Sequence, residues 1–160
     1  MQTTEKESFE IKTKSAEETI SLGARLSRFL KGGDIVALRG DLGSGKTTFV
    51  RGLVRGLHGG KGEEVTSPTF VLMHEYPGEK MIYHIDGYRL KDCEDARASG
   101  LEEFFYAGAI VVVEWAERIQ ALIPNYALKV EFGILGENER TLRISGESRL
   151  IVRISQELNR

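Results

Sequence analysis

One stretch of the chain, Gly40-Asp-Leu-Gly-Ser-Gly-Lys-Thr47, restricts the fold more than any other. It matches in full the phosphate-binding pattern G-x(4)-G-K-[ST], which indicates a nucleotide site when it lies between a strand and a helix. Residues 34–39 before it form a short apolar run typical of a buried strand, and from Lys46 onward apolar residues recur at helical spacing, namely Phe49, Val50, Leu53, Val54 and Leu57. The sequence therefore predicts a strand, a phosphate loop and a helix in succession.

The residue types of this loop suit a bound triphosphate. Glycines let successive backbone N–H groups point into one concavity, and the helix that follows adds the positive end of its dipole. Lys46 is placed to reach the outer phosphates, and the Thr47 hydroxyl is placed to ligate a magnesium ion that bridges them. The alternative is a glycine-rich connection without chemical meaning. The residues expected to contact nucleotide here are Asp41, Leu42, Gly43, Ser44, Gly45, Lys46, Thr47 and Thr48.

Length and composition set the broad class. The 160 residues suit one domain, residues 1–160, with enough chain to bury a core. The formal net charge is −2 and no block of basic residues occurs, which argues against a broad nucleic-acid footprint; any RNA contact is expected to be shared with a partner. A single cysteine, an N-terminus without an apolar core and the absence of a membrane-length apolar run predict a reduced, cytoplasmic protein without membrane contact.

The remaining patterns predict alternating strands and helices. A capping box, Ser15 with Glu18, opens a helix that ends at Gly32-Gly33, and Gly52 and Gly56 in the loop helix are expected to allow close packing on the sheet. Further helical segments are expected at 92–99, 101–106 and 117–122, the tail at 151–158 is helix or strand, and 59–64 is a mobile connection. Strands are expected at 9–13, 70–76, 80–85, 109–113, 126–132 and 140–145, the second and third of these as a hairpin and the last two antiparallel.

Two acids follow apolar strands, where open parallel sheets place their ligands. Glu114 follows Ala-Ile-Val-Val-Val, the profile of a Walker B strand, and is the favoured magnesium ligand, directly or through water. Asp86 follows Met-Ile-Tyr-His-Ile and is the other candidate. The alternatives are a structural role for Glu114 and an ion pair of Asp86 with Arg89, since a buried carboxylate needs a partner.

Three other features have more than one interpretation. Residues 66–69 (Thr-Ser-Pro-Thr) are a switch-like segment near the phosphates or a turn-and-cap sequence. Trp115 packs beside the nucleotide, on a partner, or in the core, and as the only tryptophan it would report on the site by fluorescence if it lies there. Thr13, Ser15 and the region of Arg140 are candidates for contacts with the base, and the three histidines are taken as packing or surface residues.

Taken together, these motifs resemble the bacterial TsaE family, the small P-loop ATPases of tRNA threonylcarbamoyladenosine synthesis. The resemblance covers nearly the whole chain, and its ordered set of motifs is far more specific than the loop alone. The motifs are Gly40-Asp-Leu-Gly-Ser-Gly-Lys-Thr-Thr48, Thr66-Ser-Pro-Thr-Phe70, His84-Ile-Asp-Gly-Tyr-Arg-Leu90 and Glu114-Trp115. Gly87 and Ala116 stand where the family usually has an apolar residue and a proline, and neither belongs to the reacting groups.

The resemblance implies an α/β P-loop NTPase fold with a mainly parallel central sheet, flanking antiparallel strands and helices on both faces. It implies binding of ATP and Mg²⁺, and hydrolysis that is weak alone and stimulated by the partners TsaB and TsaD, which modify adenosine 37 of tRNAs that decode ANN codons. Hydrolysis is thought to reset the complex between turnovers. By motif, Lys46, Asp86 and Glu114 are catalytic, Thr47 and Glu114 hold the metal, and Trp115 lies near the nucleotide or a partner.

Other functions remain alternatives. A small-molecule kinase shares the loop but needs an acceptor pocket and usually an arginine-rich lid, for which Arg89, Arg97 and Arg118 are too dispersed. A GTPase is disfavoured because the guanine-reading Asn-Lys-x-Asp motif is absent from the sequence. The last alternative is a nucleotide-gated binding module. In such a module ATP binding alone assembles a complex, and hydrolysis of ATP is incidental.

Overall fold

The computed structural model describes residues 5–60, 64–68 and 71–160. Strands and helices alternate along most of this chain, as expected. The strands are β1 (Lys6–Thr13), β2 (Ile35–Arg39), β3 (Met73–Tyr76), β4 (Ile82–Asp86), β5 (Ile110–Glu114), β6 (Leu128–Ile134) and β7 (Arg140–Glu147). The α-helices are α1 (Ala16–Leu26), α2 (Lys46–Leu57), α3 (Cys93–Ala98) and α4 (Ser148–Leu158), and the short 3-10 helices are η1 (Ser27–Phe29), η2 (Glu102–Tyr106) and η3 (Ala116–Leu122).

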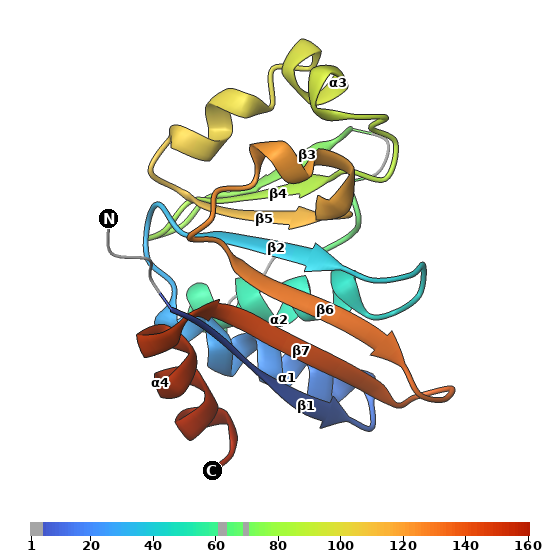
Figure 1. Cartoon of the computed structure of the whole chain (residues 1–160), viewed down its shortest axis with the longest axis vertical. Coiled ribbons are helices and arrows are strands. Elements are labelled where there is room, and N and C mark those ends of the chain that lie inside the picture. The colour runs from blue at the N-terminus through green and yellow to red at the C-terminus, as the bar shows by residue number, and fades with distance from the viewer. Residues whose placement is uncertain (1–4, 61–63, 69–70) are drawn as a thin grey trace.

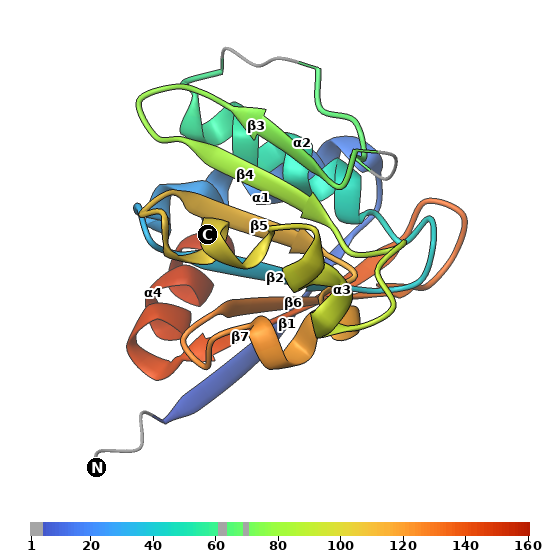
Figure 2. The same cartoon turned by 90° about the horizontal axis from the view of Figure 1, so that it is seen from above.

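Within the described ranges, all seven strands form one sheet in the order β1-β7-β6-β2-β5-β4-β3, and Figure 2 shows them following one another from β3 to β6. The central strands β6, β2, β5 and β4 pair in parallel, whereas β1 with β7, β7 with β6 and β3 with β4 are antiparallel. Parallel pairs are three of the six and lie at the centre, with antiparallel pairs on both sides, which agrees with the expected parallel centre and antiparallel flanks. The predicted hairpin of β3 and β4 and the predicted antiparallel pairing of β6 with β7 are confirmed.

The sheet is covered by helices on both faces. On one face, α1, α2 and α4 bury a core with Leu26, Phe49, Leu53 and Ile154 against the strands. On the other face, α3, η2 and η3 bury a second core that includes Phe105. Figure 1 shows α4 beside β1 and β7, and α3 at the opposite end of the sheet. The continuous apolar run of β5 is explained by this arrangement, because the strand is covered on both sides and lies between two parallel neighbours.

The capping prediction for α1 is confirmed. The Ser15 hydroxyl accepts a hydrogen bond from the Glu18 N–H at 3.1 Å, and the Glu18 carboxylate accepts one from the Lys14 N–H at 2.7 Å. Both bonds satisfy backbone donors at the beginning of the chain's first helix, where intrahelical partners are absent. The start of α1 is therefore fixed, and with it the position of Ser15 next to the phosphate loop.

Gly52 and Gly56 allow close packing, but against α1 and not against the sheet. A Cβ atom on Gly52 would lie 2.1 Å from the carbonyl oxygen of Ile20, and one on Gly56 would lie 2.1 Å from the Ser27 hydroxyl. On the facing helix, a Cβ atom on Gly23 would lie 2.5 Å from the Phe49 carbonyl oxygen. These three glycines form a seam along which α1 and α2 touch backbone to backbone.

Replacing Gly52 with alanine is expected to destabilise the protein although alanine favours helices by about 1 kcal/mol. The new methyl group would collide with backbone, which cannot move as a side chain can, and overpacking of this kind costs roughly 1–3 kcal/mol. We expect a net loss of about 1–2 kcal/mol in the free energy of unfolding, measured by urea denaturation. Gly136→Ala is the control because nothing lies within 4 Å of a Cβ there; equal stability of both variants would contradict the seam.

Several boundaries differ from the predictions. The strand expected at 70–76 begins at Met73, because Val71 and Leu72 turn the chain and Leu72 has φ 67°; residue 70 lies outside the described residues. The connection expected at 59–64 also lies partly outside them. The tail, left open between helix and strand, is the helix α4, which buries Ile151, Ile154 and Leu158. In the described part of the chain, no helix is long and apolar enough to span a membrane.

Candidate functional site

The predicted phosphate loop connects β2 to α2, the context in which its pattern indicates nucleotide binding. Gly45, directly before the helix, has φ 105°, a backbone conformation that other residues rarely adopt. A Cβ atom on Gly40 would lie 2.5 Å from the Ser44 hydroxyl oxygen and 2.9 Å from Phe132 Cβ. The chain therefore needs glycine at both ends of this turn, for backbone conformation at one and for space at the other.

Lys46 is buried and folds back over its own loop. Its ammonium group donates hydrogen bonds to the carbonyl oxygens of Gly40 and Asp41, and Nζ lies 4.3 Å from the centre of the Trp115 ring. Burial lowers the pKa of Lys46, and the nearby carboxylates, Glu114 first among them, act in the opposite direction. A phosphate group beside this ammonium would likewise raise its pKa, which favours binding of an anion here.

Thr47 and Glu114 come together, as predicted. The Thr47 hydroxyl donates to Glu114 Oε1 at 2.8 Å, and the same oxygen lies 2.9 Å from His84 Nε2. The Glu114 side chain is 3% exposed and the His84 side chain is fully buried. His84 begins one of the four family motifs, but the sequence analysis assigns it only a packing or surface role and not a place in the site. Its signal was its place two residues before Asp86, on the same face of β4.

Asp86 lies beside Glu114 at the ends of two parallel strands, because β4 and β5 pair with these residues in register. It is 2% exposed. Its carboxylate accepts hydrogen bonds from the Ser67 hydroxyl at 2.6 Å and from the Tyr88 N–H at 2.9 Å. The segment that begins at Thr66 thus contacts this acid through Ser67, while Thr69 lies outside the described residues.

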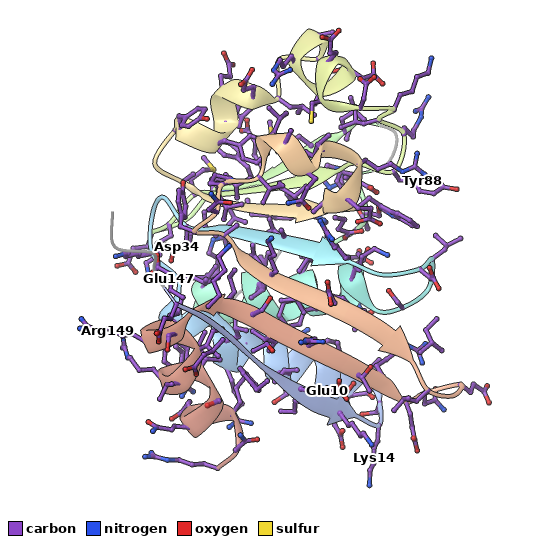
Figure 3. All side chains as sticks on the ribbon, viewed as in Figure 1. Glu10, Lys14, Asp34, Tyr88, Glu147 and Arg149 are labelled. Atoms are coloured by element: carbon purple, nitrogen blue, oxygen red, sulfur yellow. The ribbon has the colours of Figure 1, made fainter. Side chains whose placement is uncertain are left out.

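Trp115 lies at the edge of the site and is half-buried. Its backbone is left-handed, with φ 55°, which turns the chain sharply after Glu114 and directs the ring over Lys46. The Tyr88 ring centre lies 5.1 Å from that of Trp115. In Figure 3, Tyr88 lies at the edge of the sheet to which the arrowheads of β2, β4 and β5 point in Figure 1, whereas Asp34 lies at the opposite edge.

A cavity of about 450 Å³ joins these groups. The loop from Leu42 to Thr48, the strand-end acids and Trp115 form one part of its lining. Ser67 and Tyr88 also line it, and a further part comes from the beginning of α1 and from the turn between β6 and β7, with Ser15, Thr19, Glu137, Asn138 and Arg140. Sequence analysis pointed to Ser15 and the region of Arg140 only as candidates, and Thr13 instead pairs with Thr19 through their hydroxyl oxygens at 2.8 Å. A volume of this size suits a nucleotide.

Arg140 links the β6–β7 turn to the phosphate loop. One of its guanidinium nitrogens donates to the Gly43 carbonyl oxygen at 3.1 Å, and the other donates to the carbonyl oxygens of Gly136 and Glu139 at 2.8 and 2.9 Å. These bonds tie the tip of the loop to the turn. The two segments, far apart in sequence, therefore form one wall of the cavity.

The residues fit a nucleotide with its metal ion. The Ser44 hydroxyl is buried and has no hydrogen-bond partner among the described residues, as expected of a group that faces a ligand. No cluster of three or more His, Cys, Asp or Glu residues that suits a metal occurs in the described ranges. Mg²⁺ does not need one, because it usually binds through one or two protein oxygens together with phosphates and water. Thr47 and Glu114 offer two such oxygens side by side.

Comparisons with known proteins agree with this geometry. The family model described as "Threonylcarbamoyl adenosine biosynthesis protein TsaE" matches residues 13–142. The tRNA threonylcarbamoyladenosine biosynthesis protein TsaE of Treponema pallidum is 38% identical over 83% of this chain and 97% of its own length, and that of Bacillus subtilis is 35% identical over 93% and 92%. The crystal structure of Bacillus subtilis YdiB matches with a TM-score of 0.78 and 30% identity over 98% of this chain and 97% of that one. The chain therefore belongs to the TsaE family of tRNA threonylcarbamoyladenosine biosynthesis proteins.

Proposed function

We propose that residues 1–160 form a single P-loop ATPase domain that binds ATP and Mg²⁺ in the cavity above the loop of residues 40–48. The observation that carries the proposal is the convergence of four groups on that loop: the half-buried Thr47 hydroxyl and three buried groups, the Lys46 ammonium and the carboxylates of Glu114 and Asp86. Family membership supports ATP as the nucleotide. The parallel centre of the sheet, with the loop at the carboxyl end of β2, supports a P-loop NTPase fold.

In this proposal the loop amides from Asp41 to Thr48 hold the phosphates, and Lys46 moves from the carbonyl oxygens of its own loop to phosphate oxygens. Thr47 and Glu114 hold the metal ion, directly or through water. When bound, Mg²⁺ neutralises the phosphate charge that develops during the reaction. Glu114 is already aligned with Thr47 through the 2.8 Å hydrogen bond, so little rearrangement is needed to present both oxygens.

Asp86 is proposed to position the attacking water. Water attacks the γ-phosphorus in line, the bond to the β–γ bridging oxygen breaks, and the water proton ends on the released phosphate. Asp86 is buried, and its contacts with Ser67 and the Tyr88 N–H hold its carboxylate at the strand end. Slow turnover of the isolated chain follows if a partner supplies the missing stabilising group, because such a group is worth about three to five powers of ten in rate in other P-loop enzymes.

The proposed partners are TsaB and TsaD, with tRNA contacted only indirectly, in the cytoplasm. Exposed apolar side chains around the cavity support docking of a protein there: Leu42 at the tip of the loop is 75% exposed, and Ile134 and Leu135 on the β6–β7 hairpin are 51% and 52% exposed. The net charge of −2 supports the absence of a broad direct contact with tRNA.

The test is release of phosphate from ATP by the purified chain, alone and with TsaB and TsaD present. We expect slow hydrolysis alone and an increase of at least about tenfold with both partners. The partners without this chain are the control. Phosphate transfer to an acceptor without bulk hydrolysis would instead support a kinase, and hydrolysis unchanged by the partners would contradict the proposed complex.

Trp115 is expected to report nucleotide binding. It is the only tryptophan, and the Lys46 ammonium lies 4.3 Å from its ring centre, so movement of Lys46 toward phosphate changes the surroundings of the indole. Adding ATP with Mg²⁺ should change the emission of Trp115 in a saturable way. Trp115→Phe should abolish the signal and serves as the control. A tryptophan emission that does not respond to nucleotide, in a protein that binds it by calorimetry, would contradict the proposed movement of Lys46.

A further inference from the structure

His84 occupies a position that packing alone does not explain. It lies on β4 with its side chain fully buried, and its Nε2 is 2.9 Å from Glu114 Oε1. Oε1 is also the atom that accepts the Thr47 hydroxyl at 2.8 Å. Two donors from different elements, β4 and α2, therefore converge on one carboxylate oxygen.

The tautomer of His84 follows from this contact. An ionised carboxylate only accepts hydrogen bonds, so Nε2 carries the proton and donates it to Glu114. Nδ1 is buried and has no hydrogen-bond partner among the described residues. The Tyr76 ring stacks against the His84 ring, with a distance of 6.4 Å between the ring centres and an angle of 28° between the ring planes.

A histidine that served only to fill the core would be a poor choice here. Burying Nδ1 without a partner costs free energy that an apolar side chain of similar size would not cost. The one hydrogen bond that the described structure gives this ring is the one to Glu114. What histidine does at this position, and an apolar residue cannot do, is therefore to orient the Glu114 carboxylate through this hydrogen bond.

We propose that His84 is a positioning residue, which holds the Glu114 carboxylate through Nε2–H in the orientation that, together with Thr47, binds the metal ion of the bound nucleotide. This inference rests on the proposed Mg²⁺–ATP site. His84 does not touch substrate or metal; it restricts the rotation of the Glu114 side chain. Loss of such a supporting hydrogen bond lowers metal affinity by about 10-fold to 100-fold in other metal sites.

The test compares two variants of the full chain. His84→Gln keeps an N–H₂ donor near the position of Nε2, whereas His84→Leu fills similar space without a donor. Binding of ADP carrying a fluorescent N-methylanthraniloyl group is titrated at a series of Mg²⁺ concentrations and in EDTA. In the leucine variant we expect the Mg²⁺ concentration for half-maximal binding to rise at least about tenfold while the affinity in EDTA changes less than about twofold. The glutamine variant should stay within about threefold of the wild type.

Controls separate this role from a structural one. Ile82→Val, two residues away on the same face of β4 and fully buried, removes core volume without touching Glu114 and should leave the Mg²⁺ requirement unchanged. If His84→Leu does not fold, His84→Asn replaces it, because its shorter amide lies near the position of Nδ1 and cannot reach Glu114. Equal Mg²⁺ requirements in the glutamine variant and in the variant without a donor at Nε2 overturn the inference, as does an equal loss of affinity with Mg²⁺ and in EDTA.

The wild type separates failure of the inference from failure of the proposed function. Suppose that ADP binding to the wild type needs Mg²⁺ but that the leucine and glutamine variants of His84 need the same Mg²⁺ concentration as each other. The positioning role of His84 is then wrong, and the proposed metal site stands. If the wild type binds ADP equally well with Mg²⁺ and in EDTA, Glu114 holds no metal, and the inference falls together with the proposed metal site.

Discussion

Lys46→Ala is expected to raise the dissociation constant for ATP by about 100-fold, which corresponds to roughly 3 kcal/mol of binding free energy. The ammonium group is buried beside two strand-end acids, so its removal leaves phosphate facing carboxylates without the intervening cation. Calorimetry with the non-hydrolysable analogue AMP-PNP and Mg²⁺ measures the effect without turnover. The rate of ATP hydrolysis by this variant should fall to that of a blank without enzyme.

Lys129→Ala is the matched control for this change. Burial lowers the pKa of Lys129 as it does that of Lys46, but Lys129 lies on β6 outside the cavity lining. It should bind the analogue with wild-type affinity. Nucleotide affinity that survives in Lys46→Ala would remove the loop from the binding site, whatever the activity of the variant.

Glu114→Gln is expected to lower the rate of ATP hydrolysis by about 100-fold or more while binding of ATP in EDTA is retained. Glutamine keeps a carbonyl oxygen that can accept from Thr47 and His84, but it removes the negative charge that favours a metal ion. Since a buried charge is exchanged for a neutral amide of the same shape, the melting temperature should be equal or higher. Phosphate release and differential scanning fluorimetry measure the two effects.

The control and the rival function are tested with the same variants. Glu117 is an exposed acid that lies three residues after Glu114 and, like Glu114, acts electrostatically on Lys46. The control variant Glu117→Gln should hydrolyse ATP at close to the wild-type rate. If Glu114→Gln binds ATP, fails to hydrolyse it and still supports many rounds of tRNA modification with TsaB and TsaD, the chain is a nucleotide-gated assembly module. Support for a single round only would favour an ATPase that resets the complex.

The fold was largely predictable where local sequence decides the structure. The cap at Ser15, the loop between β2 and α2, and the apolar run of β5 each carry their own signal, and all three are confirmed. The order of the strands in the sheet was not predictable, because the register of a strand and the identity of its neighbours depend on contacts between distant segments. The pairing of β1 with β7, which is one of the three antiparallel pairings, has no local signature.

The candidate site divides in the same way. Lys46, Thr47, Asp86 and Glu114 belong to motifs with a fixed relation to a strand end, and the structure brings them together. Their roles remain predictions. The motifs assign no role in the site to His84 or Asn138, because a buried histidine beside a strand-end acid and a polar turn residue look the same in sequence whether or not they belong to a site. Gly52 was explained by the wrong neighbour for a related reason: a glycine indicates close approach but not which element approaches.

The pairing of Asp86 with Glu114 across β4 and β5 has a consequence for how changes far from the site should be interpreted. Side chains alternate between the faces of a strand, so a shift of β4 by one residue would exchange Asp86 and His84 for Gly87 and Ile85 on the face that meets α2. Both acids and the imidazole are thus held in place by the main-chain ladder between two strands. Core substitutions that loosen this ladder would therefore abolish the proposed hydrolysis of ATP while most of the hydrophobic core stays folded.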